Sequence, residues 1–140
     1  MKYKIRYETF EVMESPEEYI KSPEHVYDMV KKEFSPIQES MTIIGVNIKN
    51  GVIYKKQVGL GTYNILMCKP ADLFRPLLIA GCGAFIIVHN HPSGDVTPSK
   101  EDIIFTKKVE KAAEYIGVEL LDHIIFDSND FYSFKKNSII

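Results

Sequence analysis

The stretch AFIIVH, residues 84–89, limits most strongly how this chain can fold. It is apolar at every position before the histidine, whereas a strand with one face in water alternates apolar and polar residues. A strand of this composition has to be covered on both faces, and helices provide that cover in layered α/β folds. We therefore expect a sheet with helices on each side.

Other segments predict the remaining elements of such a fold. Asn50-Gly51 lies between two apolar runs and is the strongest hairpin signal in the sequence, so the two runs should be antiparallel strands. Further strands are expected at residues 1–13, as an edge strand with a bulge, at 120–126 and near 131–134. Helices are expected from Ser22-Pro23 to Ser35-Pro36, over 71–82, where Pro76 should kink the helix or mark its start, and over 99–116, with Gly117 as its cap.

These elements add up to an α/β fold, namely a single three-layer domain with a mixed β-sheet flanked by helices. A length of 140 residues suits one domain and leaves no room for a second of ordinary size. Within the domain, residues 1–35 should form an N-terminal strand and helix. Residues 36–140 should form the core with the candidate metal site.

The overall charge argues against a general attraction to nucleic acid. The formal net charge is -2 and the sequence pI is about 6.1, so only a local basic patch could draw the protein to phosphates. We expect no secretory signal, and the longest apolar run is too short to span a bilayer. We therefore expect a cytoplasmic protein without membrane contact.

Two histidines at the end of the apolar strand are candidate metal ligands. Side chains alternate along a strand, so His89 and His91 should project to one face while Asn90 points to the other. In layered α/β folds, functional sites gather at the carboxyl ends of strands. The pair is therefore placed where a metal could be bound.

Asp102 is the candidate third ligand, and it has two interpretations. Positions 102, 106, 109, 113 and 116 form one stripe of the predicted helix, so Asp102 should face the sheet. A buried carboxylate beside two imidazoles favours a bound cation. Alternatively, Ser99 and Asp102 form a capping box, in which both side chains satisfy the helix N-terminus and no metal is needed.

Zinc is the metal that suits two histidines and an aspartate. Catalytic zinc sites combine three such ligands with an open position, and zinc lowers the pKa of bound water from about 16 toward 7. Two other zinc motifs can be excluded by spacing. The sequence contains neither an H-E-x-x-H helix nor the H-x-E and P-C-x-x-C pair of the zinc deaminases.

The spacing of His89-x-His91, seven residues, Ser99, two residues and Asp102 resembles that of the JAMM (MPN-plus) metalloproteases. The longer string HNHPSGDVTPSKEDI is similar to the RadC-like branch of these proteins, bacterial and historically labelled DNA repair. Further similarity lies in SPEHVYDMV, QES, GLGTYN, LLIAGCGAFIIVHNHPSG, LLDHIIF and YSF. The helix-hairpin-helix segment of long members is not found in this sequence, which weakens a repair role.

The resemblance implies the JAMM/MPN fold, similar in architecture to cytidine deaminases, and roles for further residues. Glu39, in IQESMTIIGV, matches the catalytic glutamate, which holds the attacking water and carries its proton to the leaving amine. Ser99 would help to stabilise the oxyanion while capping the helix. Asp122 and His123 would orient a metal-bound imidazole, or else only make structural hydrogen bonds.

The function expected from this resemblance is that of a zinc-dependent hydrolase that cleaves an amide or isopeptide bond. Its substrate would be an unidentified peptide or protein. Nucleic acid stays open as a partner without support from the net charge, and so does a homodimer. The alternative function is a metal-stabilised, non-catalytic binding module associated with DNA repair or mobile-element processes.

Overall fold

The computed structural model describes residues 1–2, 11–33, 37–60 and 68–140 of the chain. The helices are α1 (Pro23–Val30), the short 3-10 helix η1 (Lys31–Glu33), α3 (Pro70–Ile79) and α4 (Lys100–Ile116). The strands are β1 (Ser40–Val46), β2 (Val52–Leu60), β3 (Ala84–Asn90), β4 (Glu119–Phe126) and β5 (Phe131–Ser133).

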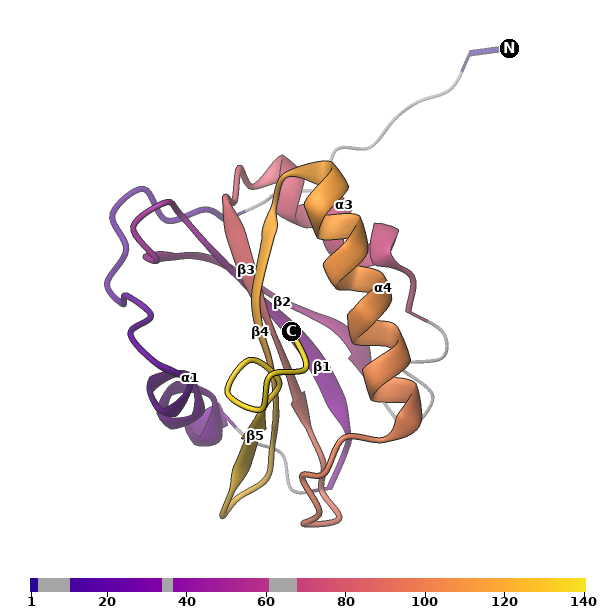
Figure 1. Cartoon of the computed structure of the whole chain (residues 1–140). Helices are drawn as coiled ribbons and strands as arrows, with labels where there is room; N and C mark the ends of the chain where they lie inside the picture. Colours follow the sequence, from indigo (N-terminus) through magenta and orange to yellow (C-terminus); the bar gives the residue numbers. More distant parts are fainter. Residues whose placement is uncertain (3–10, 34–36, 61–67) are drawn as a thin grey trace.

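The five strands form one sheet in the order β2-β1-β3-β4-β5. The sheet is mixed, because β3 and β4 run parallel while the other neighbours are antiparallel. Helix α1 covers one face, and α3 and α4 cover the other (Figure 1). The predicted α/β architecture, a mixed sheet between helical layers, is therefore confirmed.

Strand β3 lies in the middle of this sheet, and all seven of its residues are buried. Phe85 and Ile87 pack in the core beneath α3 and α4. Ile86 and Val88 belong to a second core, which includes Val26 of α1 on the opposite face. The strand is apolar at successive positions because each face has its own helical layer to pack against.

Several predicted boundaries are confirmed, and others are corrected. The hairpin turn is present, with Asn50 at φ 62°, and Gly117 caps α4 at φ 83°. Helix α3 begins at Pro70 and runs through Pro76, so Pro76 does not mark its start, and the helix ends at Ile79 and not at residue 82. Residues 3–10 of the predicted N-terminal strand and the predicted helix end at Ser35-Pro36 lie outside the described residues. Residues 11–13, predicted to continue that strand, are not in a strand. The division of the domain after residue 35 stays a prediction.

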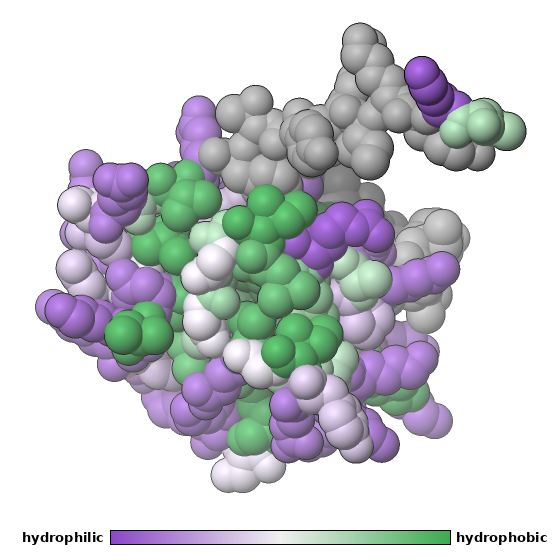
Figure 2. Space-filling model, turned by 90° about the horizontal axis from the view of Figure 1, so that it is seen from above, coloured by the Kyte–Doolittle hydropathy of each residue, from purple (hydrophilic) through white to green (hydrophobic). Residues whose placement is uncertain are grey.

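Apolar side chains gather at the end of the molecule where α4 ends and β3 begins (Figure 2). The exposed apolar residues of the last turns of α3 and α4 are Leu78, Ile79, Tyr115 and Ile116. This end lies opposite the histidines, which follow at the far end of β3. Within the described ranges, no helix is long and apolar enough to cross a membrane.

Close packing of β1 against the start of β3 generates a test of the fold. A Cβ atom on Gly45 would lie 2.3 Å from Cys82 Sγ and 3.1 Å from Leu77 Cδ2, whereas a Cβ atom on Gly83 would come no closer than 3.6 Å to its nearest neighbour. We expect Gly45→Ala to lower the free energy of unfolding by about 1–3 kcal/mol through overpacking. Urea unfolding measures the loss.

Gly83→Ala is the matched control and should change stability little. Adding Cys82→Ala to Gly45→Ala should recover part of the lost stability, because it removes the nearest clashing atom. Equal stability of the Gly45→Ala and Gly83→Ala proteins would contradict the packing described.

Candidate metal centre

The two histidines of the candidate site lie at the carboxyl end of β3. His89 is a strand residue with 1% of its surface exposed, and His91 is the first residue after the strand. Their rings stand almost perpendicular, with centroids 4.7 Å apart. The structure thus brings the two imidazoles together, as strand alternation predicts.

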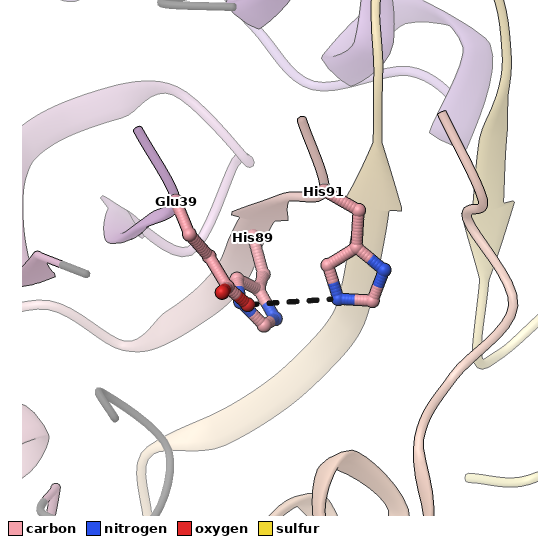
Figure 3. A group of neighbouring side chains, drawn as sticks. All are labelled: Glu39, His89 and His91. Atoms are coloured by element: carbon pink, nitrogen blue, oxygen red, sulfur yellow. Dashed lines mark hydrogen bonds and ion pairs between the residues drawn. The ribbon is translucent and has the colours of Figure 1, made fainter. Parts of the chain in front are cut away.

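The Glu39 side chain reaches the two imidazoles from just before the start of a neighbouring strand. Glu39 directly precedes β1, whose first residue, Ser40, pairs with Asn90 at the end of β3. Glu39 Oε1 lies 2.6 Å from His89 Nε2 and 3.9 Å from His91 Nε2 (Figure 3). One potential ligand atom from each of these three residues lies within 4.8 Å of the others, so the group could hold a metal ion.

Asp102 joins the site from the first turn of α4, where it also caps the helix. Its amide donates to Ser99 Oγ at 3.0 Å, and its Oδ2 accepts from the Ser99 amide at 2.7 Å, so the capping box is formed. The same buried carboxylate faces both imidazoles. Oδ1 lies 3.4 Å from His89 Nδ1, and Oδ2 lies 3.6 Å from His91 Nε2.

Asp102 therefore combines the features of both interpretations given for it. Capping holds its carboxylate in place, and the sheet-facing position brings that carboxylate to the histidines. It does not belong to the tight group of Glu39, His89 and His91. Its role as a metal ligand stays a prediction.

The charges of the site favour a cation between the two carboxylates. Burial lowers the pKa of His89, but the Asp102 and Glu39 carboxylates outweigh burial and raise this pKa above its ordinary value. Burial raises the pKa of Asp102, but His89 and the Ser99 amide hold it down to about 2. The metal-free site thus stabilises a positive charge on His89.

Hydrogen bonding prepares His91 to bind a cation. Its Nδ1 lies 2.8 Å from the Asp95 backbone oxygen, and a carbonyl can only accept. Nδ1 therefore carries the hydrogen, which leaves the lone pair of a neutral His91 on Nε2, the atom that faces Glu39 and Asp102. The sequence offered no signal for this contact, because it uses only the backbone of Asp95.

The buried nitrogen of His89 also fits a bound metal. Nδ1 has no hydrogen-bond partner among the described residues, because its contact with Asp102 at 3.4 Å is an ion pair without hydrogen-bond geometry. Imidazole nitrogens and carboxylate oxygens are ordinary ligands of zinc. A divalent cation would supply the positive charge that this set of side chains favours.

The Asp122 carboxylate makes its hydrogen bonds away from the imidazoles of the site. Its carboxylate accepts hydrogen bonds from the Ser133 hydroxyl at 2.5 Å, the Lys135 amide at 3.0 Å and the His123 amide at 2.8 Å. Burial raises its pKa. These bonds tie β5 and the following turn to β4, and the role of Asp122 at the site stays a prediction.

His123 lies behind His89 in a stack of rings. Its ring is 6.1 Å from that of His89 and 4.5 Å from that of Phe134, and its Nδ1 lies 2.6 Å from Thr106 Oγ1. Because Thr106 donates its hydroxyl hydrogen to the Asp102 carbonyl, His123 Nδ1–H donates to Thr106. Burial lowers the pKa of His123 to about 3, so the ring is neutral.

Thr106 thus connects the backbone of Asp102 with the ring of His123, and the same ring stacks on His89. Thr106 lies on the inward stripe of the helix, but the sequence alone did not single it out as part of the site. The roles predicted for His123, as a partner of a metal ligand, and for Ser99, as an oxyanion donor, stay predictions.

Comparisons with known proteins match most of this chain. A family model described as RadC-like JAB domain matches residues 20–139. A UPF0758 protein of Carboxydothermus hydrogenoformans is 43% identical over 119 residues, 84% of this chain and 53% of the relative. Another, of Clostridium perfringens, is 37% identical over 135 residues, 96% of this chain and 60% of the relative. The chain thus spans little more than half the length of these curated relatives.

The two interpretations of Asp102 predict different responses to zinc. If Asp102 is a ligand, added zinc should raise the melting temperature of the wild-type protein and a chelator should lower it, because a ligand that binds only the folded state stabilises it. Asp102→Asn should show little of either response, since an amide is a poor zinc ligand. Thermal melts with excess zinc and with chelator measure both proteins.

Glu101→Gln, at the exposed neighbouring position, is the matched control and should keep the wild-type response. If Asp102 only caps the helix, Asp102→Asn should cost about 0.3–1 kcal/mol with or without zinc. Equal zinc-dependent shifts in wild type and Asp102→Asn would therefore assign this residue to capping alone.

Proposed function

Since the chain belongs to the RadC-like JAB domain family, we propose that it is a zinc-dependent hydrolase of an amide bond in a peptide or protein, with an isopeptide bond as one candidate. The family includes JAMM-type metal hydrolases. The observation that carries the proposal is the Glu39 carboxylate 2.6 Å from an imidazole that belongs to another strand. A potential base and potential metal ligands thus share one site.

In this proposal His89, His91 and Asp102 hold the zinc ion, and Glu39 is left for proton transfer. The Asp102 side chain is 2% exposed and fixed by the capping box, as a ligand should be. The Glu39 side chain is 20% exposed and reaches the site from the edge, where it can meet water and substrate. Zinc supplies a lowered pKa for bound water and polarises the carbonyl of the substrate.

Glu39 then acts as the general base and afterwards as the general acid. Its carboxylate takes the proton of the attacking water and returns it to the nitrogen of the leaving amine, which could not depart as an anion. Ser99 lies next to Asp102 through the helix cap. A hydroxyl group can accept one hydrogen bond while donating another, so Ser99 can cap α4 and also donate to the developing oxyanion.

A metal-stabilised, non-catalytic module is the second candidate, and the position of Glu39 favours it. If Glu39 were itself a ligand, the two histidines and two carboxylates would supply four protein ligands. Structural zinc sites have four such ligands and no open position, whereas catalytic sites keep one open. The role of Glu39 therefore decides between an enzyme and a binding module.

Glu39→Gln separates the two candidates. In an enzyme, the variant should keep about one zinc per chain but lose hydrolysis by about a hundredfold or more, because the amide cannot accept the proton of water. Elemental analysis measures the zinc, and mass spectrometry of a peptide and isopeptide library measures cleavage. Glu114→Gln, an exposed change on α4, is the control and should alter neither.

Loss of zinc from the Glu39→Gln protein would assign Glu39 to the ligands and support the structural site. A wild-type protein that carries zinc but cleaves no member of the library would argue for the binding module. A protein that takes up no transition metal even after reconstitution would exclude both candidates.

A further inference from the structure

Glu39 occupies a position that strand pairing by itself does not hold. Ser40 is the first residue of β1, and its pairs with Asn90 of β3 and Leu60 of β2 are the first in both ladders. Glu39 lies one residue outside these ladders. A carboxylate that has to approach His89 closely therefore needs another restraint on its backbone.

The side chain of Asn90 supplies such a restraint on both sides of Glu39. Its Oδ1 accepts from the amide of Ser40 at 2.6 Å and from the hydroxyl of Ser40 at 2.7 Å. Its Nδ2 donates to the backbone oxygen of Gln38 at 2.8 Å. Three hydrogen bonds from one side chain thus hold the residues immediately before and after Glu39.

We propose that Asn90 is a positioning residue that holds the Glu39 carboxylate against His89. Asn90 is 2% exposed and stands between His89 and His91 in the chain, on the opposite face of the strand. The three residues are consecutive in the chain at the end of β3. The segment that carries the imidazoles therefore also fixes the glutamate that approaches them.

Strand alternation explains how Asn90 can act from the other face of the sheet. Ser40 lies opposite Asn90, and the next residue, Met41, lies opposite His89 and packs in the core under α3 and α4. Alternation places Glu39 on the same face as Met41. A clamp on the α1 face thus directs the Glu39 side chain toward the imidazoles on the opposite face.

The chemistry of the clamp requires a side-chain amide, which Asn90 provides. A backbone amide can only donate and a backbone oxygen can only accept, so the side chain between them must present an acceptor at one end and a donor at the other. Aspartate has the right size but no donor for Gln38, and alanine has neither group. This requirement explains a buried amide side chain at the end of β3.

The first test measures an NMR signal of the metal-free protein, because this readout does not depend on activity. The ¹⁵N signal of His89 Nε2 at fixed pH reports the contact with Glu39. In Asn90→Ala and Asn90→Asp, we expect this signal to move most of the way to its position in Glu39→Ala. Aspartate has nearly the same shape as asparagine, so Asn90→Asp can be measured even if Asn90→Ala does not fold.

Asn47→Ala is the matched control. Asn47 also accepts two backbone hydrogen bonds, from Lys49 and Gly51 at 2.9 Å each, but it lies beyond the far end of β1. This change should leave the His89 signal at its wild-type position. Adding Asn90→Asp to Glu39→Ala should move the signal no further, because a residue that acts through Glu39 has no effect once the carboxylate is gone.

The second readout rests on the proposed function of Glu39. With a cleavable substrate, Asn90→Asp should lower kcat by about tenfold or more with little change in KM, since misplacement of a catalytic group slows the chemical step. Zinc affinity, measured by chelator competition, should stay within about threefold of wild type, because the proposed ligands lie on β3 and α4.

The outcomes separate the positioning role from the proposed function. An unmoved His89 signal in both Asn90 variants, or an equal shift in Asn47→Ala, would overturn the positioning role. An equal shift from Asn90→Asp with and without the Glu39 carboxylate would overturn it as well. If the wild type cleaves nothing but the signals behave as expected, the hydrolase proposal fails while Asn90 still positions Glu39.

Discussion

The antiparallel pairing of β1 with β3 is the constraint on which the candidate site depends. It sets Ser40 opposite Asn90, fifty positions later in the chain, and thereby brings Glu39 to the two histidines. A shift of this pairing register by one residue would turn the Glu39 side chain to the other face of the sheet. The apolar side chains of β1 and β3 resist such a slip because each is matched to one of two cores.

The site concentrates negative charge where water is scarce, and the fold stabilises it through several hydrogen bonds. Asp102 is held by Ser99, and its backbone oxygen accepts from Thr106, which in turn accepts from His123. A buried carboxylate without such partners would destabilise the folded state. The same restraints hold the ligand atoms in place before a cation arrives, which is what a metal site requires.

Helix α4 shows how a structural device and a functional one can use the same atoms. The capping box places the Asp102 carboxylate at the helix start, and the parallel crossover from β3 to β4 places that start beside the histidines. The sequence predicted both the box and the inward stripe. Their coincidence at one carboxylate explains why capping and metal binding could not be told apart by pattern.

Local patterns in the sequence determined the helical layers, the hairpin, the capped helix and the common face of His89 and His91. Each of these features follows from a side-chain period of 2.0 or 3.6 residues, or from a turn residue. Glu39 was located only through family resemblance. The tertiary structure alone decided that Glu39 touches His89, that Asn90 clamps its neighbours and that His123 stacks behind the site. These contacts join residues far apart in the chain, and strand register and side-chain direction, which no local period encodes, determine them.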